Sequence, residues 1–247
     1  MEARAPDIDP AVRAAVERSF LSRVPAEALA QLLAGATVQS IPAGTTTYRA
    51  GGEARVSVVV SGLVRTFLVG PDGRQVTIRY AREGDVLGIM TALGGPAPLH
   101  AQALTDAQRL RLDRDALRDL AHQDTAVAWA LMEELTRTVH SLWQEISATA
   151  FATVPQRVAR HLLEIAAREQ EAEGGTLVAR VSQQELADLA GSVREVVARA
   201  LRELRDEGIV RVSRSGISVL DATALAAHAW PREIYASRDV STPPHVT

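Results

Sequence analysis

The stretch that decides the fold is SQQELADLAGSVREVVARALRELRDEGIV, residues 182–210. Its first residue, Ser182, together with Glu185 three positions later, is a capping box, which predicts the start of a helix. Gly191 predicts the end of that helix, because glycine readily takes the left-handed conformation that stops a helix. Ser192 and Glu195 repeat the capping pattern, so a second helix is expected to begin only a few residues later. Two short helices joined this closely predict a helix-turn-helix.

The second predicted helix has an apolar side and a charged side. The apolar side, which is expected to be buried, consists of Val193, Val197, Ala200, Leu201 and Leu204. The charged side consists of Glu195, Arg199 and Arg202, with Arg194 at its N-terminal edge. Arginine pairs with guanine O6 and N7, and glutamate accepts from cytosine N4, so these residues suit the major groove. The alternative is an ordinary solvated face, in which Glu195 caps its own helix or pairs with Arg199.

Residues 209–220, IVRVSRSGISVL, predict two short strands around Ser215-Gly216. This hairpin would form a wing beside the helix-turn-helix, where Arg211 and Arg214 can reach phosphates. The remaining DNA contacts are expected from Ser182, Gln183, Ser192 and Val196.

The first half of the chain shows a different periodicity. Residues 11–36 predict two short helices separated by a turn at Pro25. From residue 57 to residue 88, short β-branched runs alternate in hydrophobicity and are separated by glycine-containing turns, as in half-buried hairpin strands. Regularly spaced short strands predict a sandwich or jelly roll.

A long helix is expected over residues 125–153, because apolar residues recur there in steps of three and four. The repeat consists of Ala128, Met132, Leu135, Val139, Leu142, Ile146 and Thr149. Such a seam favours dimerisation along the helix, and the alternative is a helix buried against its own domain. The expected dimer contacts are Met132, Leu135, Val139, Leu142 and Ile146.

Composition excludes several classes of protein. The 247 residues are enough for two domains, and 47% hydrophobic residues allow both to form a core. There is no cysteine, which excludes disulfides, thiol catalysis and Cys-ligated iron–sulfur clusters. All 27 basic residues are arginine, which suits phosphate and guanine recognition, although an arginine-rich codon usage explains it equally well. No secretory signal or membrane-spanning run is visible, so a cytoplasmic protein is expected.

The order of these elements resembles that of the cAMP-receptor/fumarate-nitrate-regulator (Crp/Fnr) superfamily of bacterial transcription regulators. The resemblance rests on the Arg-Glu-x-x-x-Arg core at Arg194, Glu195 and Arg199, and on GDVLG, SGLVRTFLVGPDGRQVTIRY and RVARHLLEIA. It implies an α+β fold with a cyclic-nucleotide-binding-like β jelly roll, a long dimerisation helix and a winged helix-turn-helix. It also implies a homodimer on double-stranded DNA, an inverted repeat with TGTGA-like half-sites, and RNA polymerase as a partner.

The resemblance divides the chain into five parts. These are a helical arm over 1–22, a β-roll effector domain over 23–124, a dimerisation helix over 125–153, a DNA-binding domain over 154–226, and a flexible tail over 227–247.

The effector position departs from the cAMP-binding members of the superfamily. They have Gly-Glu for the ribose and an arginine for the phosphate, whereas this chain has Gly88-Ile89 and then Leu99-His100-Ala101. Their adenine-binding Thr-Ser pair corresponds to Leu142-Trp143. The resulting pocket is expected to be apolar and uncharged, so cAMP is not the expected effector and the cofactor is unknown. Haem bound through His100, His122 or His140 is an alternative, although no two of these have metal-ligand spacing.

Two other functions compete with the regulator. A regulatory binding module would share the β-roll but would not need Arg194, Glu195 and Arg199. A cupin-like enzyme would need clustered histidine and glutamate ligands for a metal, which VTIRY and the neighbouring strands lack. An enzyme is therefore not expected.

Overall fold

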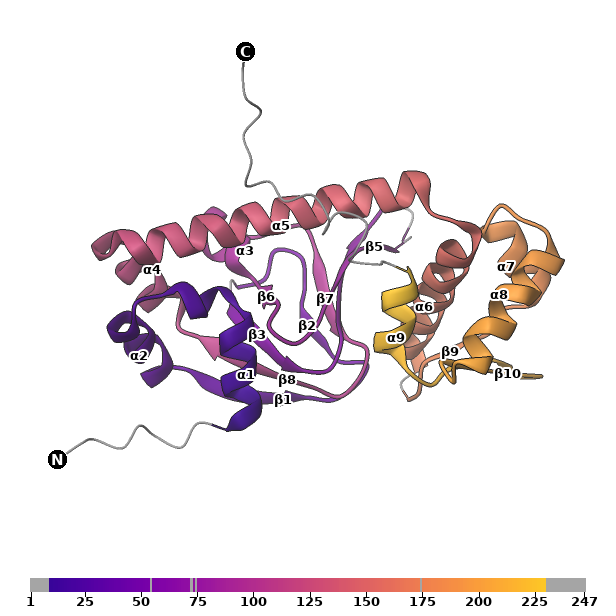
Figure 1. The fold of residues 1–247 in the computed structure, drawn as a ribbon, viewed down its shortest axis with the longest axis horizontal. Helices are drawn as coiled ribbons and strands as arrows, with labels where there is room; N and C mark the ends of the chain where they lie inside the picture. Colours follow the sequence, from indigo (N-terminus) through magenta and orange to yellow (C-terminus); the bar gives the residue numbers. More distant parts are fainter. Residues whose placement is uncertain (1–8, 54, 72, 74, 174, 230–247) are drawn as a thin grey trace, which may run out of the picture.

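The computed structural model describes residues 9–229 except 54, 72, 74 and 174, and only the backbone of 144–150 and 171–173. Figure 1 shows an N-terminal β-roll, a long helix that runs along it, and a helical C-terminal domain at the far end. This is the predicted α+β architecture. The predicted tail begins inside a helix, because residues 227–229 belong to α9, and residues 230–247 lie outside the described chain.

The N-terminal helices pack on the β-roll. Helix α1 (Pro10–Arg18) is capped by Asp9, whose carboxylate accepts from the Ala11 N–H at 2.8 Å. A 3₁₀ helix, η1 (Phe20–Arg23), precedes α2 (Ala26–Ala34), so the region holds one more turn than the sequence predicted. Phe20 and Leu21 are fully buried in the same core as Val56 and Val58 of the β-roll.

The β-roll consists of two four-stranded antiparallel sheets. The first has the order β1 (Thr37–Ile41), β8 (Ala107–Leu112), β3 (Val56–Ser61) and β6 (Val86–Leu87). The second has the order β2 (Thr46–Tyr48), β7 (His100–Ala103), β4 (Val64–Val69) and β5 (Gln75–Ala81). The roll interior between them is lined by aliphatic residues, among them Ile41, Val59, Val64, Ala81, Ala101 and Ala103.

The expectation of half-buried strands is wrong for the first four residues of β4. Val64, Arg65, Thr66 and Phe67 are all buried, on both faces of the sheet. One face packs into the roll interior, and the other meets the C-terminal domain. The alternation is also interrupted by a bulge between Thr66 and Phe67 where β4 pairs with β5.

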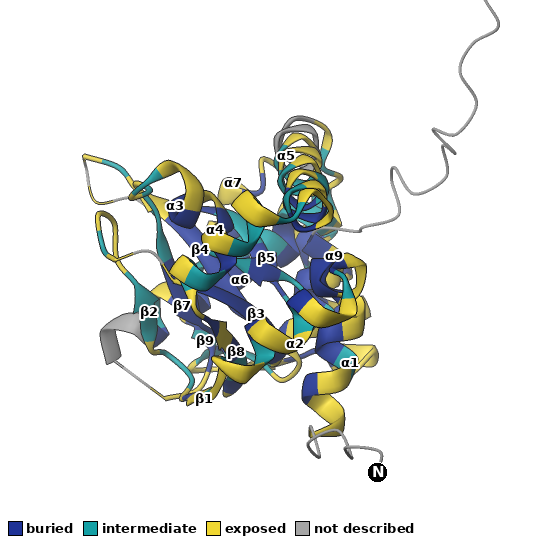
Figure 2. Cartoon of the chain, turned by 90° about the vertical axis from the view of Figure 1, so that its left-hand side faces the viewer, coloured by how far each residue is buried: buried dark blue, intermediate teal, exposed yellow. Residues whose placement is uncertain are grey.

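Three helices follow or interrupt the strands. They are α3 (Ile89–Gly94), α4 (Arg114–Gln123) and α5 (Thr125–Phe151), the 27-residue long helix. Asp124 caps α5, since its carboxylate accepts from the Ala126 N–H at 2.8 Å. Only one side of the first turns of α5 packs on the β-roll, and Figure 2, which looks nearly along this helix, shows exposed residues on its described turns.

The C-terminal domain has the predicted winged helix-turn-helix order. Helix α6 (Val154–Glu173) and strand β9 (Val178–Ala179) precede α7 (Gln183–Leu189) and α8 (Arg194–Asp206). Strands β10 (Val210–Ser213) and β11 (Gly216–Val219) form the wing, and α9 (Ala222–Ala229) closes the domain on α6. The sheet order is β10-β11-β9.

The two domains share a buried contact. The Gln102 side chain on β7 donates to the Ala167 carbonyl on α6 at 3.2 Å, and Gln170 on α6 donates to the Leu104 carbonyl at 3.1 Å. Leu104 and Tyr80 of the β-roll belong to the same apolar cluster as the buried face of α6. Helix α6 therefore lies directly on the outer face of the second sheet.

None of the described helices is long and apolar enough to cross a membrane.

Candidate DNA-binding surface and dimer helix

The turn of the helix-turn-helix forms as the sequence predicts. The Glu185 N–H donates to Ser182 Oγ at 3.2 Å, and the Ser182 N–H donates to the Glu185 carboxylate at 2.8 Å. The hydrogen bond from the Ser182 backbone N–H, with a smaller contribution from the Ser182 side chain, lowers the pKa of the Glu185 carboxylate below its usual value. Gly191 is left-handed, with φ of +57°, and ends α7. The predicted capping box and glycine turn are both confirmed.

The start of α8 differs from the prediction. The residue that caps this helix is Val193, which makes no side-chain cap hydrogen bond, so Ser192 and Glu195 form no second capping box. Val193 is also 58% exposed, although the sequence placed it on the buried side. As the cap residue it lies outside the helical repeat, which explains why the helical periodicity misplaced it. The other predicted core residues, Val197, Ala200, Leu201 and Leu204, are buried.

The charged side of α8 is exposed to solvent. The side chains of Arg194, Glu195, Arg199 and Arg202 are exposed, and none of these side chains makes a hydrogen bond or an ion pair with another described residue. Nearby charges behave differently, since Arg205 pairs with Asp206 at 2.9 Å. The intrahelical alternative, Glu195 paired with Arg199, is therefore not formed. The exposed charges stay available for another molecule.

The remaining predicted DNA contacts lie around α8. Ser182 begins α7 and is exposed, whereas Gln183, Ser192 and Val196 are half-buried. In the wing, Arg211 and Arg214 are exposed on β10 and in the turn that follows it. Ser213 fixes that turn, because its hydroxyl lies 2.9 Å from Ser215 Oγ and donates to the Gly216 carbonyl at 2.9 Å. Figure 1 places α7, α8 and β10 together at the end of the molecule farthest from the β-roll.

The residues expected around an effector lie in different places. Ile89 is buried in the core that also contains Phe20, and Ala101 is buried in the roll interior. Leu99 is half-buried, and His100 stacks on Phe67 with ring centroids 5.2 Å apart. Gly88 must be glycine, because its φ is +83° and a Cβ there would lie 1.8 Å from the Arg55 carbonyl oxygen.

His100 belongs to a stack that the sequence did not reveal. Arg65 is 1% exposed, its guanidinium lies 4.1 Å from the centre of the Phe67 ring, and it donates to Gln75 at 2.6 Å. By its strand register Arg65 lies opposite Tyr80 and Gln102, on the sheet face that meets α6. His100 therefore lies on this outer face, whereas Ala101 points into the roll interior.

Two further histidines were candidate haem ligands. His122, near the end of α4, and His140, on α5, are exposed, and the His140 ring lies 5.3 Å from the Trp143 ring. Among the described residues, no group of three or more His, Cys, Asp or Glu side chains could hold a metal ion.

Helix α5 exposes an apolar stripe that is offset from the predicted seam. Met132 and Val139 are exposed as predicted, but Leu135 packs against the core of the β-roll and Leu142 is half-buried. The side chain of Ile146 lies outside the described residues. The exposed apolar stripe instead consists of Trp129, Met132, Val139 and Trp143, with Thr136 between them. Its spacing of three, four, three and four residues is still a heptad repeat.

Two family models match the chain. Residues 38–124 match the cyclic nucleotide-binding domain, and residues 156–228 match the Crp-like helix-turn-helix domain. The CRP-like cAMP-activated global transcriptional regulator of Mycobacterium tuberculosis is 30% identical over 192 residues, covering 76% of this chain and 86% of that protein. The transcriptional regulator LdrP of Thermus thermophilus is 30% identical over 190 residues, covering 74% of this chain and 92% of that protein.

Solved structures have the same fold. A crp/fnr-family protein from Eubacterium rectale is 21% identical, has a TM-score of 0.54, and aligns over 85% of this chain and 97% of that one. A regulatory protein from Silicibacter pomeroyi is 24% identical, has a TM-score of 0.52, and aligns over 90% of this chain and 99% of that one. The open charged helix, the β-roll and the matched relatives agree, and the chain belongs to the Crp/Fnr family of DNA-binding transcription regulators.

Proposed function

We propose that this regulator binds DNA as a homodimer and reads an inverted repeat through two copies of α8. The observation that carries this proposal is the set of unpaired charges on α8, namely Arg194, Glu195, Arg199 and Arg202. Unpaired exposed charges need not give up an internal ion pair before they contact a base or a phosphate.

Each charged residue of α8 has a separate role in the proposed complex. Arg194, at the N-terminal end of the helix, pairs with a guanine, and Arg199 pairs with a second guanine one turn later. Glu195 accepts from a cytosine on the opposite strand. Arg202, with Arg211 and Arg214 of the wing, contacts phosphates. Together with the family resemblance, these contacts suggest TGTGA-like half-sites about one helical turn apart.

The dimer would form along α5. Without a partner, the four large apolar side chains of the exposed stripe would remain in water. If two chains pair through a two-fold axis along α5, the stripe of each chain covers the stripe of the other. Met132 and Val139 would lie at the centre, and Trp129 and Trp143 at its ends. Residues 125–153 would then be the dimerisation helix, between a β-roll over 23–124 and a DNA-binding domain over 154–226.

The effector is proposed not to be cAMP. The relative from Mycobacterium tuberculosis is named as cAMP-activated. In this chain, however, Ile89 and Leu99 stand where the resemblance expects the glutamate and arginine that bind ribose and phosphate. An aliphatic side chain cannot accept from a hydroxyl or donate to a phosphate. A haem-dependent gas sensor and a regulator without an effector are the alternatives.

The protein would act in the cytoplasm with RNA polymerase as its partner, as the family resemblance implies. Three measurements test the proposal. In-vitro selection of DNA sites should return a palindrome, and isothermal titration with cAMP should show no binding in the micromolar range. Native mass spectrometry with an absorption spectrum of the purified protein should show a dimer and would reveal any haem. Selection without a palindrome, or micromolar binding of cAMP, would contradict the corresponding part of the proposal.

A further inference from the structure

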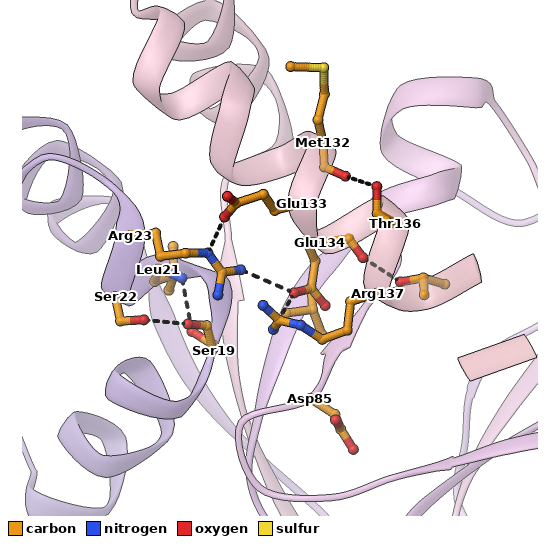
Figure 3. A network of polar contacts seen from close by, with 12 residues as sticks. Ser19, Leu21, Ser22, Arg23, Asp85, Met132, Glu133, Glu134, Thr136 and Arg137 are labelled. Atoms are coloured by element: carbon orange, nitrogen blue, oxygen red, sulfur yellow. Dashed lines mark hydrogen bonds and ion pairs between the residues drawn. The ribbon is translucent and has the colours of Figure 1, made fainter. Parts of the chain in front are cut away.

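Helix α5 carries a buried carboxylate on the side opposite its exposed stripe. Glu134 is 4% exposed and is the only acidic side chain among the described residues that is buried. Arg137, one turn later on α5, donates to its carboxylate at 2.8 Å. The guanidinium of Arg23 lies 3.7 Å away, as Figure 3 shows.

The charges around Glu134 come from three segments of the chain. Arg23 belongs to η1 and also pairs with Glu133 at 2.8 Å, while Arg137 belongs to α5 itself. From the β-roll, Arg79 on β5 and Asp85 in the turn before β6 face the same region, and these two lie 3.8 Å apart. Glu134 therefore joins the N-terminal region to the long helix, within electrostatic range of two charged residues of the β-roll.

Stability alone does not explain a carboxylate at this position. Burial raises the pKa of Glu134 above its usual value, and it outweighs the opposing effect of Arg137, Arg79 and Arg23, while Asp85 raises it further. The ionised carboxylate is therefore less favourable in the folded protein than in water. An apolar side chain of similar size often makes such a site as stable or more stable.

Glu134 lies where it can control how α5 is rotated about its own axis. The buried side of the helix holds Val127, Ala130, Leu131 and Glu134. An α-helix turns by about 100° per residue, which places the stripe of Trp129, Met132, Val139 and Trp143 roughly half a turn from Glu134. From residue 135 to residue 143 no side chain of α5 is fully buried. Glu134 is thus the last fully buried side chain on this described part of the helix, before Val139 and Trp143.

We propose that Glu134 is a positioning residue, which fixes the rotation of α5 so that its exposed stripe faces the second copy of the chain. This inference rests on the proposed dimer. Apolar contacts at Leu131 and Leu135 tolerate small rotations, because they have no preferred direction. A carboxylate held by a planar guanidinium has a defined direction, so the pair selects one rotation.

The test compares dimerisation with stability in variants of the full chain. Glu134→Leu should leave the melting temperature unchanged or raise it, because Arg23 and Arg137 are partly exposed and can return to water. The same variant should weaken the dimer by about tenfold or more in sedimentation velocity. Glu134→Gln should dimerise nearly as the wild type does, because its amide oxygen still accepts from Arg137. A purely structural role would instead lower stability and dimerisation together.

Two further variants keep the test decisive. Arg137→Met removes the partner without touching the core and should also weaken the dimer. Glu133→Gln is the matched control, because it removes a neighbouring charge from Arg23 but keeps the acceptor for the Trp129 indole, which lies 3.0 Å away. A wild-type monomer would overturn the dimer and this role with it. A wild-type dimer with unchanged dimerisation in Glu134→Leu and Arg137→Met would overturn this role alone.

Discussion

Glu195 and Arg199 lie one turn apart on the exposed face of α8, yet they form no ion pair with each other or with any other described residue. In an isolated helix such a pair contributes only about 0.2–0.5 kcal/mol, so little holds it together in water. In the proposed complex DNA would offer each residue a better partner, a cytosine amine for Glu195 and a guanine edge for Arg199.

The two ends of α8 should respond differently to mutation. Arg194→Ala should cost about 1–3 kcal/mol of binding free energy and relax the preference at one guanine, because it removes a bidentate contact to a base. Arg202→Ala should weaken binding to all DNA sequences equally, because it removes the proposed phosphate contact. It should also reduce the slope of log affinity against log salt concentration by about one. Fluorescence anisotropy on single-base variants of the selected half-site, repeated over a range of salt, separates the two effects. Unchanged specificity in Arg194→Ala would mean that another element reads the bases.

The stripe on α5 makes a prediction about the oligomer. The double variant Met132→Glu with Val139→Glu should be monomeric and should lose specific DNA binding, because four like charges would meet at the two-fold interface. Val38→Glu is the matched control, since Val38 is equally exposed on β1 but far along the chain from the stripe. Sedimentation velocity at micromolar concentration measures the outcome. A dimeric double variant would show that another surface joins the two copies.

The sequence predicts the features of this fold that depend on neighbouring residues better than those that depend on residues distant in the chain. The capping box of Ser182 and the turn at Gly191 involve neighbouring residues, so the local sequence specifies them. Repeat spacing predicted the length of α5 but not its rotation, because the β-roll covers Leu135 through contacts that are distant in sequence. The burial of both faces of β4 has the same origin, since it depends on where α6 packs. Nothing in the sequence indicated that Glu134 is buried, because an isolated glutamate on a helix is usually exposed to solvent.

The capping box should contribute measurably to the helix-turn-helix. Ser182→Ala should cost about 0.5–2 kcal/mol of unfolding free energy, because the Glu185 N–H loses its acceptor. Hydrogen bonds depress the pKa of Glu185, so its stabilisation is present above the ordinary glutamate pKa and is lost as the pH falls through the lower folded value. Denaturant titrations of the wild type and of Glu185→Ala should therefore converge at acidic pH. Ser22→Ala, which removes a hydroxyl from η1, controls for the loss of a serine elsewhere. An equal difference between wild type and Glu185→Ala at every pH would contradict the reciprocal cap.

Glu134 should show the opposite dependence on pH. Because burial raises its pKa in the folded protein, the folded state binds the proton more tightly than the unfolded state does. The stabilisation that comes from this tighter proton binding is complete below the ordinary glutamate pKa, and it is lost as the pH rises through the higher pKa of the folded state. At neutral pH the ionised carboxylate therefore lowers the unfolding free energy, and Glu134→Gln removes that effect.

The melting temperature of Glu134→Gln should exceed that of the wild type at pH 7, and the difference should shrink as the pH approaches the ordinary glutamate pKa. Glu133→Gln, at the neighbouring half-buried position, should show no such trend. If the melting temperature of the wild type instead rose relative to that of Glu134→Gln with increasing pH, the favourable interactions with Arg137, Arg79 and Arg23 would outweigh the cost of burial. The buried carboxylate would then stabilise the fold.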